Sequence, residues 1–185
     1  MEDSRIIALF LERSEQAVEA LDHKYGEAVR KTAMNILRNR QDAEECANDT
    51  WLGVWNTVPP QHPNPLVSYV CRIARNLAIN RYHANTAAKR NDTYDVALEE
   101  LEECIPSALN VEDQVLAGEL SAAISRFLDS VPYEDRFCFM RRYWFSDSVI
   151  DIAATMHWKP HRVTVRLSRL REKLHQYLKE EGLIA

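Results

Sequence analysis

Residues 146–174, SDSVIDIAATMHWKPHRVTVRLSRLREKL, contain the clearest structural pattern in the chain. Ser146 or Ser148 can cap a short helix, and Pro160 suits the first position of a longer one, where a missing N–H costs nothing. Apolar residues then recur at the spacing of one helix face: Val163, Leu167, Leu170 and Leu174. The pattern predicts two helices joined by a tight turn, which is the sequence form of a helix-turn-helix.

The second of these helices is basic on the faces that the apolar stripe leaves free. Between Lys159 and Lys179 the chain has seven Lys or Arg residues and one acid, Glu172. We expect the side opposite the stripe to meet base edges and the basic flanks to meet phosphates. The candidate DNA-contacting residues are His161, Arg162, Thr164, Val165, Arg166, Ser168, Arg169, Arg171 and Lys173. The alternative is a solvated basic helix in an all-helical protein.

The composition favours an all-α protein of one or two small domains. The 185 residues include only four glycines, and few stretches alternate apolar and polar residues as strands do. No apolar stretch approaches the roughly 18 residues of a membrane span, and the acidic N-terminus lacks a signal-peptide pattern, so we expect a cytoplasmic protein. The four cysteines lie far apart, which favours reduced, buried thiols. We expect no metal site and no cofactor.

The net charge of −5 is unevenly distributed along the chain. Residues 91–119 contain nine acids and no Lys or Arg, so the rest of the chain is net positive. Residues 84–114 also lack sustained periodicity, which favours a linker. The alternative explanation of the acid run is that these residues are simply solvent-exposed. We predict two helical domains at 1–88 and 115–185, joined by an acidic linker at 89–114.

The N-terminal part has the pattern of amphipathic helices. We expect one or two helices at 5–37, another from Asp42, and a third from near Leu66 that follows a proline-rich loop at 59–65. The apolar stripe of the helix from Asp42 comprises Ala47, Trp51, Val54, Trp55 and Val58. The face that this stripe leaves exposed carries Glu44, Glu45, Asn48 and Asp49.

The helix from Leu66 combines basic and aromatic residues on its polar side. The candidate residues there are Tyr69, Arg72, Arg75, Asn76 and Asn80. Aromatic rings can stack on unpaired bases while guanidinium groups hold phosphates, so this mixture suits single-stranded nucleic acid. The alternative is an ordinary amphipathic helix with a solvent-exposed basic face, which has the same pattern.

Three segments in this order resemble parts of the bacterial sigma factors. Residues 42–55, DAEECANDTWLGVW, resemble the family's core-binding signature, and residues 69–80, YVCRIARNLAIN, resemble the stretch that follows it. Residues 149–174 look like the fourth sigma region, except that His157 stands where the turn usually has Gly, at a position that often needs a positive φ. The layout of two domains and a short linker is similar to the extracytoplasmic-function type.

The resemblance implies a role for each candidate group. It implies that Glu44, Glu45, Asn48 and Asp49 dock on the β′ coiled coil of core RNA polymerase. It also implies that Tyr69, Arg72, Arg75, Asn76 and Asn80 meet the opened −10 element, while the loop at 59–65 captures a flipped base. The basic helix would read the −35 element as duplex, and the acidic linker would pass through polymerase. An anti-sigma factor is a further possible partner, since the family commonly has one.

We therefore expect a sigma factor that directs core RNA polymerase to promoters by −35 recognition and −10 melting. No catalytic residues are needed for this function, because polymerase carries out the chemistry. A stand-alone helix-turn-helix regulator is the main alternative, and a helical adaptor without a DNA role is another. An enzyme is disfavoured because the sequence has no Gly-rich phosphate loop, metal-ligand spacing or nucleophile constellation.

Overall fold

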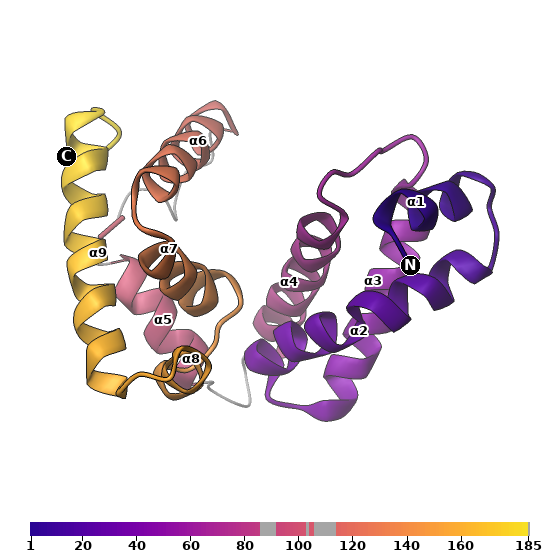
Figure 1. Cartoon of the computed structure of the whole chain (residues 1–185), viewed down its shortest axis with the longest axis horizontal. Helices are drawn as coiled ribbons and strands as arrows, with labels where there is room; N and C mark the ends of the chain where they lie inside the picture. The colour runs from indigo at the N-terminus through magenta and orange to yellow at the C-terminus, as the bar shows by residue number, and fades with distance from the viewer. Residues whose placement is uncertain (86–91, 103, 106–113, 185) are drawn as a thin grey trace. The chain divides into compact units, whose positions relative to one another are not determined.

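All regular structure is helical in the part of the chain that the computed structural model describes, namely residues 1–85, 92–102, 104–105 and 114–184 (Figure 1). This confirms the all-α prediction. Two compact units divide the chain, one at Met1–Asn91 and the other at Asp92–Ala185.

The N-terminal unit is a small helical bundle. Its helices within the described residues are α1 (Asp3–Leu11), α2 (Gln16–Leu37), α3 (Arg40–Thr57) and α4 (Leu66–Asn85). The last three pack on one another, and α1 packs on α2. Phe10, Leu21, Val54 and Leu66 are almost completely buried at the centre, so every helix contributes to the core.

The start of α3 is determined by a side-chain cap. The Oδ1 atom of Asn39 accepts hydrogen bonds from the backbone N–H groups of Gln41 (2.9 Å) and Asp42 (3.2 Å). Because these N–H groups have no partner within the helix, the cap lets α3 begin at Arg40, slightly before the expected start at Asp42. The predicted apolar stripe faces the core: Ala47, Trp51, Val54 and Val58 are buried and Trp55 is partly buried.

The proline-rich segment 59–65 contains no helix, as its four prolines predict. Val58 before it and Pro63 within it are buried, so the segment is anchored to the unit. Helix α4 then begins at Leu66, at the predicted position.

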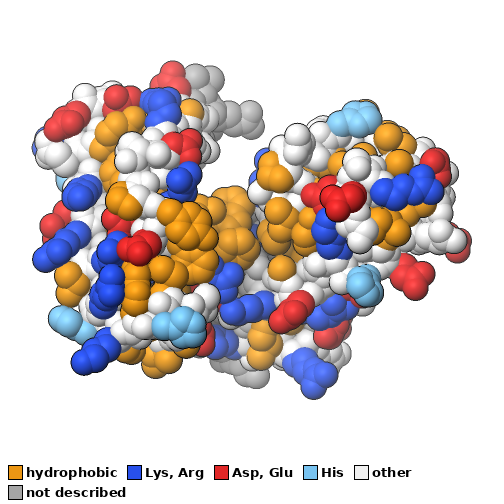
Figure 2. Space-filling model, viewed as in Figure 1, with side chains coloured by type: hydrophobic (Ala, Val, Ile, Leu, Met, Phe, Trp, Pro, Cys, Tyr) orange, Lys and Arg blue, Asp and Glu red, His pale blue; other side chains and the backbone are white. Residues whose placement is uncertain are grey.

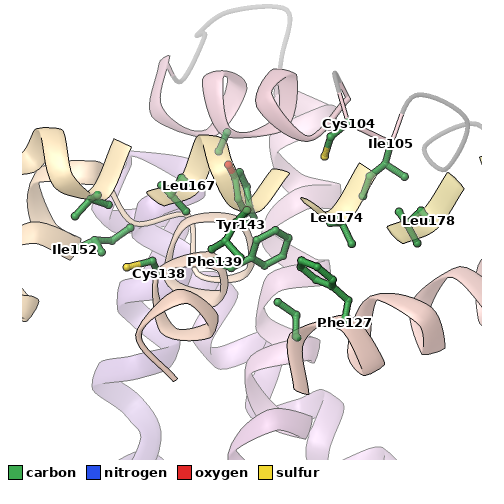
Figure 3. Close-up of a cluster of buried hydrophobic side chains, with 14 of the residues drawn as sticks. Cys104, Ile105, Phe127, Cys138, Phe139, Tyr143, Ile152, Leu167, Leu174 and Leu178 are labelled. Atoms are coloured by element: carbon green, nitrogen blue, oxygen red, sulfur yellow. The ribbon is translucent and has the colours of Figure 1, made fainter. Parts of the chain in front are cut away.

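The C-terminal unit surrounds a core to which α9 contributes a full row of leucines. Its helices within the described residues are α5 (Asp92–Glu102), α6 (Gln114–Ser130), α7 (Tyr133–Phe139), α8 (Val149–Met156) and α9 (Pro160–Glu180), and a π-helical segment, Met140–Trp144, continues α7. Figure 3 shows Leu174 and Leu178 of α9 beside Phe139 and Phe127 in this core. α9 thus packs on α6, α7 and α8 through one apolar stripe.

Helix α5 lies in the segment where the sequence predicts a linker. The division between the units falls at Asn91 and Asp92, so α5 belongs to the C-terminal unit. Ala97, Cys104 and Ile105 are buried in the core of that unit. Helix α5 has few apolar residues among many acids, so its sequence shows no clear apolar stripe. For this reason sequence periodicity did not indicate a packed helix. Residues 89–91, 103 and 106–113 of the predicted linker lie outside the described residues.

The connection between α8 and α9 has the predicted form of a short helix, a tight turn and a longer helix. The Ser148 hydroxyl caps α8 by accepting a hydrogen bond from the N–H of Asp151 (3.1 Å). His157 ends α8 in the left-handed region with a φ of 54°, at the position where the family resemblance expects Gly. Trp158 follows, and Pro160 is the first residue of α9, as predicted. The four stripe residues, Val163, Leu167, Leu170 and Leu174, are all buried.

The four cysteines are free and buried, which agrees with the prediction of reduced, buried thiols: Cys46, Cys71, Cys104 and Cys138. Within the described ranges, no helix is both long and apolar enough to cross a membrane.

Candidate functional site

The predicted polymerase-docking residues of α3, which are three acids and one asparagine, form one exposed surface. Glu44, Glu45, Asn48 and Asp49 are all exposed, and we call this group the α3 acidic face. They point outward because the apolar stripe on the other side of α3 packs into the core. The structure therefore brings these four predicted residues together on one side of the unit.

Two arginines from neighbouring helices pair with the α3 acidic face. Arg30 of α2 lies 2.9 Å from the Glu44 carboxylate, and Arg81 of α4 lies 2.9 Å from Glu45 and 3.7 Å from Asp49. The three carboxylate side chains are 48%, 50% and 53% exposed. Ion pairs this exposed contribute little to stability, about 0–1 kcal/mol each. Their carboxylates can therefore exchange these partners for basic groups on another molecule.

Helix α4 presents a polar row along its exposed side. Arg72, Asn76 and Asn80 recur every four residues and are all exposed, and we call them the α4 polar row. Arg75 and Tyr69 are partly buried beside the row. All five predicted residues of this helix thus have at least part of their surface accessible.

Tyr69 is held in place by two contacts. Its hydroxyl donates a hydrogen bond to the Oγ1 of Thr57 (2.7 Å), the last residue of α3. The guanidinium carbon of Arg72 lies 5.4 Å from the centre of its ring. These contacts place the Tyr69 ring at the end of α3, where the proline-rich segment 59–65 begins, and next to the α4 polar row.

The predicted DNA-contacting residues of α9 fall into two groups by exposure. Those fully exposed are His161, Arg162, Thr164, Arg169 and Lys173. Those partly buried are Val165, Arg166, Ser168 and Arg171. Figure 2 shows Lys and Arg side chains gathered along the side of the C-terminal unit that α9 occupies in Figure 1. The exposed bases can reach a ligand directly, whereas the partly buried ones have partners within the unit.

Arg166 is held by two acids of α7. Its Nη2 donates to Glu134 (2.9 Å), and its Nη1 donates to Asp135. The Arg166 guanidinium carbon also lies 4.8 Å from the centre of the Trp158 ring, and that of Arg162 lies 3.9 Å from the same ring. Sequence reasoning did not identify these contacts, because the two acids precede Arg166 by more than thirty residues.

Arg171 on the other flank of α9 is held by the acidic helix α5. Its Nη1 donates to Glu100 (3.2 Å) and to the Tyr143 hydroxyl (2.8 Å), and that hydroxyl donates to Glu100 (2.9 Å). Burial, together with the neighbouring Glu100 carboxylate, raises the pKa of Tyr143, so its hydroxyl stays protonated as a donor. The acidic segment therefore contributes a structural contact to the basic helix.

A comparison with known families identifies the N-terminal unit. Residues 21–88 match the family model of sigma-70 region 2. This part of the chain is a sigma-70 region 2. The matched range contains the α3 acidic face, the proline-rich segment and the α4 polar row. The sigma factors that contain this region are transcription initiation factors without catalytic activity, and the sequence likewise predicts that this chain is not an enzyme.

Two further comparisons concern the chain as a whole. The chain is similar over 96% of its length to 97% of the chain in a solved structure described as "Structure of CnrH in complex with the cytosolic domain of CnrY", with 18% sequence identity and a TM-score of 0.45. No curated protein sequence matches it. Helix α9 lies outside the matched region 2, so its role is inferred from its own geometry and from the sequence resemblance.

Proposed function

We propose that this protein is a sigma factor of the extracytoplasmic-function type, which directs core RNA polymerase to promoters by −35 recognition and −10 melting. The observation that carries the proposal is the match of residues 21–88 to sigma-70 region 2, with the exposed α3 acidic face and α4 polar row inside it. Two helical units, the second of which begins with an acidic segment, resemble the layout of that type. The protein would act in the cytoplasm, where polymerase works.

In this proposal the α3 acidic face docks on the coiled coil of the polymerase β′ subunit. Its carboxylates already accept guanidinium groups from Arg30 and Arg81, so the surface suits basic side chains. Because these pairs are half exposed, a basic partner can replace them at small cost. Opposite electrostatic potentials would also steer the two proteins together and select their orientation.

The α4 polar row would meet the −10 element after its strands separate. The guanidinium of Arg72 can donate to phosphates, and the amides of Asn76 and Asn80 can reach base edges. The Tyr69 ring offers a stacking surface for an unpaired base. The proline-rich segment 59–65, which begins beside that ring, would receive a flipped non-template base, since an extruded base needs a pocket.

Helix α9 would read the −35 element in the major groove. In a helix-turn-helix the first residues of the second helix contact base edges, which assigns that role to His161 and Val165. The exposed basic side chains of Arg162, Arg169 and Lys173 lie on one flank and would contact backbone phosphates. An anti-sigma factor that covers one of these surfaces is the regulatory partner that the family resemblance implies.

A pull-down of core RNA polymerase tests the proposal. Wild-type protein should retain polymerase, and Asp49→Arg should lose it, because a positive charge replaces an exposed carboxylate of the α3 acidic face. The matched control is Glu119→Arg, which makes the same kind of charge reversal at an exposed position of α6. Circular dichroism verifies that each variant is folded.

The outcome distinguishes the proposal from its main alternative. Loss of polymerase in Asp49→Arg with retention in Glu119→Arg supports docking through α3, and transcription from a genomic template library then identifies the promoters. If the wild-type protein retains no polymerase but binds duplex DNA tightly as a dimer, the sigma-factor mechanism is wrong and a stand-alone regulator is correct.

A further inference from the structure

Trp158 occupies the turn between α8 and α9, next to the residues that begin the basic helix. His157 adopts a left-handed conformation, and the N–H of Trp158 then donates to a carbonyl of α8 (2.8 Å). The indole is partly buried and packs against the core of the C-terminal unit. The turn therefore holds the Trp158 backbone and ring in one place relative to α9.

Two guanidinium groups of α9 lie against this indole ring. Arg162 and Arg166 follow Trp158 by four and eight residues, so all three form one row along the start of the helix. The guanidinium carbons lie 3.9 Å and 4.8 Å from the ring centre. Both distances are within the range of an attractive cation–π contact, and the shorter one corresponds to close stacking.

The two arginines differ in what else they contact. Arg166 is tied to α7 through Glu134 (2.9 Å) and Asp135, and only 27% of its side chain is exposed. Arg162 is exposed and lies in the first turn of α9. Arg166 is thus committed to contacts within the unit, whereas Arg162 can bind another molecule.

Stacking on the indole leaves the hydrogen-bonding edge of Arg162 accessible. A guanidinium group has five N–H donors in its plane, and a stacked arrangement uses its face instead. A phosphate oxygen can accept two of these in-plane donors at once. A side chain that is already ordered also loses less conformational entropy when it binds.

We propose that Trp158 is a positioning residue that holds Arg162 ready to donate to a backbone phosphate of duplex DNA. Arg166, fixed by the α7 acids, supports the stack from within the unit and does not itself contact DNA. The inference rests on the proposed function, because it requires α9 to lie against DNA. It adds a specific role for a turn residue that the sequence did not single out.

A double-mutant cycle on the full chain tests the proposal. Binding to a short, labelled, random-sequence duplex is measured by fluorescence anisotropy between about 50 and 200 mM salt, where phosphate contacts dominate the affinity. The variants are Trp158→Leu, which keeps apolar bulk in the core, Arg162→Gln, and the two combined. Arg169→Gln is the matched control, because Arg169 is exposed and lies seven residues further along the same flank.

The proposal predicts a specific pattern of affinities. Arg162→Gln should weaken binding. It should also reduce by about one the slope of log binding constant against log salt concentration (the salt slope), which is the effect of one lost phosphate contact. Trp158→Leu should weaken binding about two- to ten-fold, because Arg162 must then be ordered upon binding. The combined variant should bind no more weakly than Arg162→Gln alone. The effects of Trp158→Leu and Arg169→Gln on the affinity should instead multiply, because these side chains act independently.

Each other outcome identifies which inference is wrong. If the effects of Trp158→Leu and Arg162→Gln multiply, Trp158 does not position Arg162. The proposed binding of DNA by α9 is still supported in that case if both arginine variants weaken binding. If neither arginine variant changes the affinity or the salt slope, α9 does not face DNA and the proposed function of this unit fails. Should Trp158→Leu not fold, Trp158→Phe keeps an aromatic face, and the cycle should then show the wild-type dependence on Arg162; loss of that dependence would overturn the proposal.

Discussion

Glu100 connects α5 to the rest of the C-terminal unit, and its replacement by Gln tests this connection. Its Oε1 accepts a hydrogen bond from Arg142 (3.1 Å), and its Oε2 accepts from Tyr143 (2.9 Å) and Arg171 (3.2 Å). The Arg142 side chain is only 4% exposed, so Glu100 compensates a nearly buried positive charge. Glu100→Gln keeps the size of the side chain and removes its negative charge.

The expected loss of stability follows from the burial of this pair. Removing one partner of a fully buried ion pair costs about 3–5 kcal/mol. The cost is smaller here, because Glu100 is 24% exposed and Arg142 also donates to the carbonyls of Asp147 (3.3 Å) and Thr93 (3.5 Å). We expect the free energy of unfolding of the C-terminal unit to fall by about 2 kcal/mol. For a domain of this size that lowers the Tm by about 10 °C.

Urea unfolding combined with hydrogen exchange measures the effect in each unit separately. The amides of α5 and α9 should exchange faster in Glu100→Gln, while those of the N-terminal unit should not change. The control is Glu99→Gln, the same chemical change at the exposed neighbouring position, which should cost less than about 0.5 kcal/mol. Equal stabilities of the two variants would refute the reasoning, since α5 would then be held by its apolar contacts alone.

Two further predictions concern the N-terminal unit. Asn39→Ala should lower the free energy of unfolding by about 1 kcal/mol, because the first N–H groups of α3 lose their acceptor, whereas Asn39→Asp should retain most of it; thermal unfolding followed by circular dichroism measures both. Burial raises the pKa of Cys46 from 9.0 to about 11, so the folded state keeps this proton longer than the unfolded chain does. The stability from this thiol is therefore complete below pH 9 and is lost as pH rises from about 9 to 11; the urea midpoint should fall less steeply over that interval in Cys46→Ala, and equal slopes would contradict the assignment.

Local patterns in the sequence were enough to predict most helices and their buried faces. The stripes of α3 and α9 were predictable because a helix repeats every 3.6 residues and only one side can face a core. Exposure of the α3 acidic face followed from the same geometry. The segment 59–65 was predictable because proline cannot continue a helix. The resemblance to sigma factors rested on the order of short motifs at residues 42–55, 69–80 and 149–174, and residues 21–88 match the family model of sigma-70 region 2.

The partners of the charged residues could not be predicted in this way. Arg81 and Glu45 are 36 residues apart in sequence, and Arg171 and Glu100 are 71 apart. Which acid an arginine meets depends on how helices pack, and many acids in an acidic chain are equivalent until that packing is known. The same holds for α5, whose few apolar residues show no clear stripe until they contact the core.

The sequence by itself determined most helices, their apolar faces and the resemblance to sigma factors, because each depends on residues a few positions apart. Only the tertiary structure decided which bases of α9 remain available. Arg166 and Arg171 are held by acids from α7 and α5, whereas Arg162 stacks on Trp158 and stays exposed. The physical reason is that charge and periodicity make these arginines alike, and long-range packing alone gives each one a different partner.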